Sequence, residues 1–198
     1  VKSRISEADK LVLKQWIAGG APLVPSAHPR QFIPQGEAQD ATLADREKID
    51  RRSRRFIRYF TFAHLHDAGL TDDELQTYRN AFNKTVNSLS WHPKIRNPEP
   101  IEPTGTILRI DLRWYMWDFT IWNRILNDYP YGILDDSTTL RAIMVSTATK
   151  VPMLRGDWFV ATATRPPLYQ EILVLPASLA ELERQLRVDS TLNITQER

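Results

Sequence analysis

Apolar residues recur at helical spacing over most of the chain, which predicts a mainly helical protein. The first helix is predicted over residues 7–18, with Trp16 on its apolar face. Ser6 and Asp9 form a capping box that satisfies two amide donors at the start of this helix. A pair of glycines at its end predicts the stop.

Two further helical segments are predicted to form a hairpin. The first covers residues 43–67, with a break near Ser53, and ends at Gly69, which suits a left-handed C-cap. The second begins after Thr71, which with Glu74 makes another capping box. The short turn between them brings the two helices side by side.

The C-terminal half contains one clear strand and several short helices. Residues 106–112 alternate between apolar and polar side chains, which predicts a strand. Residues 158–163 fit either a strand or a helix. Helices are predicted over residues 118–127, 138–148, 167–173 and 178–187.

These elements predict a mainly α fold, an irregular helical domain with a minor β element and Pro-rich loops. Four prolines between residues 21 and 36 predict an extended linker. The helix before this linker is too short to build a core of its own. We therefore expect an N-terminal arm over residues 1–40 and a helical domain over residues 41–198.

Composition narrows the function classes. With 42% hydrophobic and 25% charged residues, the 198-residue chain can bury a core. A net charge of +2 gives no strong field for nucleic acid. The absence of cysteine excludes thiolate metal sites, iron–sulfur clusters and covalent haem attachment in this chain.

The sequence shows no targeting or membrane-spanning segment. No run of about 18 apolar residues is present, so we expect no transmembrane helix. The first residues lack the apolar core of a signal peptide. Because the chain begins at Val1 and not at Met, we expect a processed or truncated chain.

Candidate catalytic or metal-binding residues are scarce. No nucleophile elbow, zinc-protease, P-loop or dinucleotide-binding motif occurs. On the predicted helix, His64 and His66 point in different directions and cannot share one metal ion. We expect no catalytic, cofactor or metal residue here, and interpret both histidines as packing or surface residues. The alternative is that one of these histidines is an axial ligand to the haem of a neighbouring domain.

A basic run is the first candidate docking surface. Arg51, Arg55 and Arg58 would share one face of the predicted helix. One interpretation pairs them with the acidic residues at positions 45–50 within the same helix. The other is a docking surface for an acidic partner.

The aromatic segment at residues 114–122 also allows two interpretations. Such density is typical of a hydrophobic core. If Trp114 or Trp117 is exposed, a docking surface becomes the better interpretation of this segment. In the same way, an exposed Trp16 would favour docking through the first helix. A substrate pocket lined by this segment is the corresponding enzyme hypothesis.

Several segments together resemble planctomycete-type cytochrome proteins. Residues 5–22, which end in the phrase W-I-A-G-G-A-P, resemble the closing helix of a cytochrome c domain. Segments similar to those downstream of such domains are residues 55–75, 86–91, 106–112, 129–132 and 165–169.

The resemblance implies an exported bacterial protein, periplasmic or otherwise extracytoplasmic, that acts in electron transfer or in an undefined oxidation. It implies that this chain carries no haem and that haem c is bound by a neighbouring domain or subunit. That partner could belong to a membrane electron-transfer complex. The expected role is therefore a haem-free accessory module that acts by docking. The alternative is an enzyme domain that binds a small substrate in an aromatic-lined pocket beside a haem partner. The missing catalytic motifs favour the first.

Overall fold

The computed structural model describes residues 5–18, 31–132 and 137–196, in two compact units, Val1–Gln31 and Phe32–Arg198. In the first unit α1 (Glu7–Ala18) forms as predicted. The amide of Asp9 donates to Ser6 Oγ over 3.1 Å and closes the first turn. Within α1 no side chain is buried.

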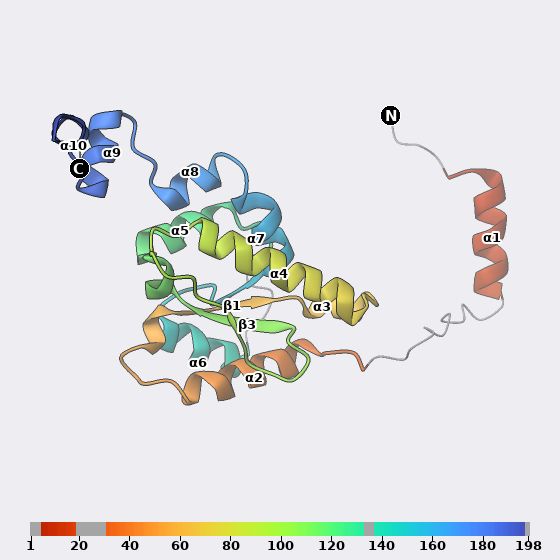
Figure 1. The fold of residues 1–198 in the computed structure, drawn as a ribbon. Helices are drawn as coiled ribbons and strands as arrows, with labels where there is room; N and C mark the ends of the chain where they lie inside the picture. The colour runs from red at the N-terminus through yellow and green to blue at the C-terminus, as the bar shows by residue number, and fades with distance from the viewer. Residues whose placement is uncertain (1–4, 19–30, 133–136, 197–198) are drawn as a thin grey trace. The chain divides into compact units, whose positions relative to one another are not determined.

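The second unit is mainly helical around a small sheet (Figure 1). Its helices are α2 (Gln35–Glu47), α3 (Ala63–Asp67), α4 (Asp72–Ser88), α5 (Phe119–Asp128), α6 (Thr138–Thr147), α7 (Gly156–Ala163), α8 (Leu168–Leu173), α9 (Leu179–Leu186) and α10 (Ser190–Thr195). Its strands are β1 (Ile57–Thr61), β2 (Glu99–Pro100), β3 (Ile107–Asp111) and β4 (Met153–Arg155), with 3-10 turns η1 (Arg54–Phe56) and η2 (Leu112–Tyr115).

The four strands form one mixed sheet in the order β2-β3-β1-β4. β1 pairs antiparallel with β3, with Tyr59 opposite Arg109. β1 pairs parallel with β4, with Phe60 opposite Leu154. Because β1 and β4 run in the same direction, their carboxyl ends lie at one edge of the sheet.

Helices cover both faces of the sheet. α2 and α6 lie on one face, and α4, α5, α7 and α8 lie on the other (Figure 1). Side chains of β1 alternate between these layers, so that Tyr59 packs with Ala38 of α2 while Phe60 belongs to the larger core with Phe82 of α4. The Tyr59 hydroxyl donates to Asp45 Oδ2 over 3.0 Å and fixes α2 to the sheet.

The predicted helical segment over residues 43–67 is wrong in its central part. Its two ends are helical, in α2 and in α3, but a turn, η1 and the central strand β1 lie between them. Residues 57–60 are all buried because helices cover both faces of the strand. A strand buried on both faces shows no apolar–polar alternation, which removes the signal that identifies strands from sequence.

Most predicted helix boundaries with strong capping residues are confirmed. The Thr71–Glu74 capping box is present at the start of α4. Asp118 and Ser178 accept amide hydrogen bonds at the starts of α5 and α9. Much of the predicted Pro-rich linker, residues 19–30, lies outside the described residues. The division between the units falls after Gln31, and α2 runs across the predicted boundary at residue 40.

Candidate functional site

The structure separates the docking candidates into exposed and buried residues. Arg51 and Arg55 are exposed, Trp16 is 48% exposed, and Trp114 is half-buried. Arg58 and Trp117 are only 1% and 4% exposed. These two residues therefore do not belong to a docking surface.

Arg58 has a structural position in β1. Its guanidinium is 5.0 Å from the centre of the Trp122 ring. Its Nη1 donates to three carbonyl oxygens, those of Arg55 at 3.0 Å, Ile57 at 2.7 Å and Thr147 at 3.1 Å. Burial lowers the pKa of Arg58 to about 10, against the opposing effect of the Asp111 charge. Arg58 thus ties the end of α6 to the sheet.

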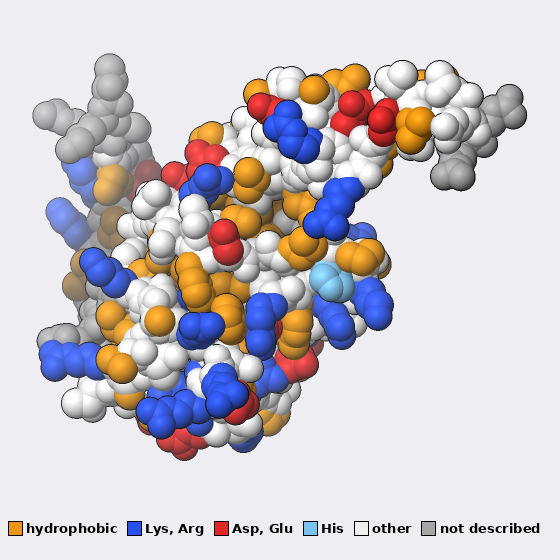
Figure 2. All heavy atoms as spheres, turned by 90° about the vertical axis from the view of Figure 1, so that its left-hand side faces the viewer, with side chains coloured by type: hydrophobic (Ala, Val, Ile, Leu, Met, Phe, Trp, Pro, Cys, Tyr) orange, Lys and Arg blue, Asp and Glu red, His pale blue; other side chains and the backbone are white. Residues whose placement is uncertain are grey.

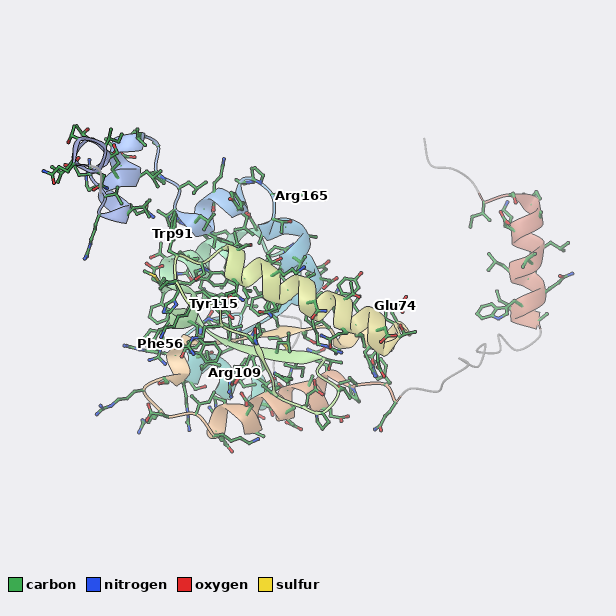
Figure 3. All side chains as sticks on the ribbon, in the orientation of Figure 1. Phe56, Glu74, Trp91, Arg109, Tyr115 and Arg165 are labelled. Atoms are coloured by element: carbon green, nitrogen blue, oxygen red, sulfur yellow. The ribbon has the colours of Figure 1, made fainter. Side chains whose placement is uncertain are left out.

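A group of exposed arginines and two phenylalanine rings, one exposed and one half-buried, lies where η1 meets η2. We call Arg51, Arg52, Arg55, Phe56, Arg113 and Phe119 the Arg/Phe surface. The guanidinium carbons of Arg55 and Arg113 lie 4.7 and 4.6 Å from the centre of the Phe56 ring. Phe56 stacks on Phe119 at 5.3 Å between ring centres with an interplanar angle of 9°. Phe56 is labelled in Figure 3, and Figure 2 shows basic and hydrophobic side chains interspersed on the face to which it belongs.

The alternative interpretation, ion pairing within one helix, is wrong for these arginines. Among the described residues no carboxylate lies within ion-pair distance of Arg51, Arg52 or Arg55. The nearby acidic residues have other partners. Asp45 pairs with Arg109 at 2.7 Å, and Asp50 Oδ2 accepts the amide of Arg52 at 2.9 Å. The three cations are therefore available to an external anion.

A pocket of about 310 Å³ lies at the carboxyl ends of β1 and β4. We call it the β1/β4 pocket. α2, α3 and α6 contribute side chains to its lining, together with residues 129–132 after α5. Open clefts at the carboxyl ends of parallel strands are common ligand sites, because the strands diverge there into separate helices.

His64 and Asp157 face each other beside this pocket. Each residue lies in the helix that follows a parallel strand, and His64 Nε2 is 2.9 Å from Asp157 Oδ1. Burial alone would raise the pKa of Asp157, but the adjacent His64 ring outweighs burial and holds the pKa below its ordinary value. His66 instead contacts Asp67, at 3.1 Å, so the two histidines point apart.

Arg155 brings a cation to the pocket. Its guanidinium carbon is 4.2 Å from the centre of the Tyr131 ring. Its backbone amide donates to the Tyr129 hydroxyl oxygen over 3.3 Å. Burial raises the pKa of Tyr129, although Arg155 opposes this shift. In the described part of the chain, Arg155 has no carboxylate within ion-pair distance.

The aromatic segment at residues 114–122 contributes mainly to the core. The indole nitrogens of Trp117 and Trp122 donate to the Leu89 carbonyl at 2.8 Å and the Thr149 hydroxyl at 3.1 Å. A hollow of about 420 Å³ lies beside Trp117. Among the described residues that line this hollow, Asp118 is the only ionisable one. The described lining of the hollow beside this segment therefore does not bring together the several ionisable groups that the enzyme hypothesis requires.

The comparisons with known proteins add no relative. No protein family, curated protein or solved structure matches this chain. Over the described ranges, no group of three or more acidic or histidine side chains is placed to hold a metal ion. None of the described helices has both the length and the hydropathy needed to cross a bilayer.

Sequence reasoning missed the β1/β4 pocket because it depends on the misassigned strand. The sequence shows His64 only as one of two histidines in a predicted helix, because the parallel strands that bring it opposite Asp157 are not evident from the pattern. Pocket residues also come from segments far apart in the chain, such as Ile33 and Arg155. The pocket could be found from sequence only through the polar residues that follow β1 and β4. This signal is visible only when both segments are recognised as strands.

Proposed function

We propose that this chain is a haem-free accessory module that docks against a haem c-bearing domain or subunit. The proposal places it in an extracytoplasmic electron-transfer protein, where the Arg/Phe surface meets an acidic face of the haem-bearing partner. The observation that carries the proposal is the stacking of the half-buried Phe56 on the exposed Phe119. Beside these rings lie Arg51, Arg52 and Arg55, which have no carboxylate partner among the described residues.

The composition of this surface suits a protein interface. Arginine and aromatic residues are enriched at the energetic centres of interfaces. The guanidinium of Arg113 is held by Asp111, whose Oδ1 accepts from Nε over 2.9 Å. Arg113 is therefore fixed over the Phe56 ring before any partner binds, which lowers the entropy cost of association.

Two further features support a haem-bearing partner. Residues 5–22 resemble the closing helix of a cytochrome c domain, and α1 in this segment buries none of its side chains. Leu11, Val12 and Ile17 on α1 are 58%, 63% and 64% exposed. Apolar side chains such as these are stabilised by packing against further apolar surface, which the proposal assigns to the haem-bearing partner.

Co-purification from the native host tests the proposal. The chain is isolated at low ionic strength, and its visible absorption and intact mass are measured together. A Soret band, with haem on a co-purifying subunit or on the same polypeptide, is the expected result. A colourless species with the mass of the 22.9 kDa chain alone would contradict the proposal.

A further inference from the structure

We propose that the β1/β4 pocket binds a small monocarboxylate with an apolar body, and that Arg155 binds the carboxylate group. This proposal does not depend on the docking function, because the pocket and the Arg/Phe surface share no residue.

The apolar body of the ligand follows from the walls of the pocket. Ile33 and Ala38 line it from the side of α2, Ile143 from α6, and Met153 from β4. A volume of about 310 Å³ lies at the lower end of the range for small-molecule sites. Apolar walls of this size favour a compact hydrocarbon or aromatic group.

The charge of the ligand follows from the polar end of the pocket. The Arg155 guanidinium carries five N–H donors, and its carbon lies 4.2 Å from the centre of the Tyr131 ring. The Tyr129 hydroxyl oxygen already accepts the Arg155 amide, so its own proton is left for donation to another acceptor. Both residues line the pocket, and a guanidinium and a phenolic donor together suit the two oxygens of a carboxylate.

The acidic residues near the pocket do not neutralise Arg155. Asp67 Oδ1 accepts the backbone amide of Ile33 at 3.0 Å and contacts His66. Asp157 pairs with His64 at 2.9 Å. Arg155 therefore keeps its positive charge for the ligand, and one cation with one phenol suits a monoanion better than a phosphate dianion.

Titration with small carboxylates tests the proposal. Benzoate and hexanoate are added to the protein, and binding is measured by calorimetry and by amide chemical shifts. We expect saturable binding of one of these probes, with shifts concentrated at residues 61–67 and 153–157. We expect benzamide, the neutral analogue of benzoate, to bind at least about tenfold more weakly than benzoate where benzoate is the bound probe.

Variants separate the role of Arg155 from general charge effects. Arg155→Gln should weaken binding at least about tenfold. Arg165→Gln is the matched control, since Arg165 is exposed and does not line the pocket, and it should leave affinity unchanged. Saturable binding lost in Arg155→Gln alone supports the proposal. Three results would overturn it: no saturable binding of either carboxylate, equal affinity for benzoate and benzamide, or undiminished binding by a folded Arg155→Gln variant.

Discussion

The guanidinium of Arg113 lies 4.6 Å from the centre of the Phe56 ring, although the two residues belong to different 3-10 turns. The contact follows from the antiparallel pairing of β1 and β3, in which Ile57 is opposite Asp111. The residue before β1 and the residue shortly after β3 are thereby brought together. The central pairing of the sheet therefore assembles the Arg/Phe surface.

Gly156 allows the start of α7 to approach the core. A Cβ atom added at Gly156 would lie 2.2 Å from Cζ of the Phe62 ring, which is fully buried. We expect Gly156→Ala to lower the free energy of unfolding by about 3 kcal/mol, because the buried ring or the backbone must shift to admit the added methyl group. Chemical denaturation measures the change.

Gly36 provides the matched control in α2, because a Cβ added there meets no atom within 4 Å. Gly36→Ala should leave stability unchanged or raise it by up to about 1 kcal/mol. Equal effects of the two alanine substitutions would show that the close approach at Phe62 does not constrain the fold.

Glu102 organises the turn before β3. Its carboxylate accepts the backbone amides of Thr104 at 2.6 Å, Gly105 at 3.1 Å and Ile107 at 2.8 Å. Burial alone would raise its pKa, but hydrogen bonds from the Thr104 hydroxyl, from the amides of Ile107 and Thr104, and from the Thr106 hydroxyl outweigh burial and hold the pKa below the ordinary value of 4.5. Glu102→Gln should cost about 1–3 kcal/mol of stability at neutral pH.

The pH dependence of this difference has a defined sign. Since the folded pKa of Glu102 is lowered, its stabilising contribution is complete above the unfolded pKa and is lost as the pH falls through the folded pKa. The stability gap between wild type and Glu102→Gln should therefore narrow below about pH 4.5. Denaturation curves at several pH values measure the gap, and Glu37→Gln serves as an exposed control. A gap that is constant with pH would contradict the account.

Arg58 is expected to be essential for stability and not for docking. Arg58→Ala removes the donor for three carbonyl oxygens and opens space beside Trp122, so we expect a loss of about 3 kcal/mol. The exposed Arg52→Ala should change stability by less than about 0.5 kcal/mol. The melting temperatures of the two variants are compared by thermal unfolding. Similar melting temperatures would refute the structural role of Arg58.

The local part of the fold could be predicted from sequence. The Thr71–Glu74 capping box and the Asp118 cap act within one helical turn, so their signal lies in neighbouring residues. β1 could not be predicted in this way, because its burial on both faces is produced by helices distant in the chain.

The candidate sites also combine features that neighbouring residues predict with features that depend on contacts distant in the chain. Arg51 and Arg55 were recognisable as a cluster from their spacing, but the Arg113–Phe56 contact depends on strand pairing. Arg58 lies in the same run and is buried, since alternation along β1 turns it toward Trp122. Neither burial nor long-range pairing is encoded in local spacing.

The affinity of the 198-residue chain for its haem-bearing partner tests the central claim most directly. The chain is added in trans to the haem-bearing component isolated with it, and wild type is compared with Arg55→Glu and Arg165→Glu at low salt. Arg165 lies far from Phe56 (Figure 3), so the two variants carry the same charge change at different sites. We expect Arg55→Glu to bind at least about tenfold more weakly while Arg165→Glu binds like wild type. Equal affinities of the two variants would contradict docking through the Arg/Phe surface.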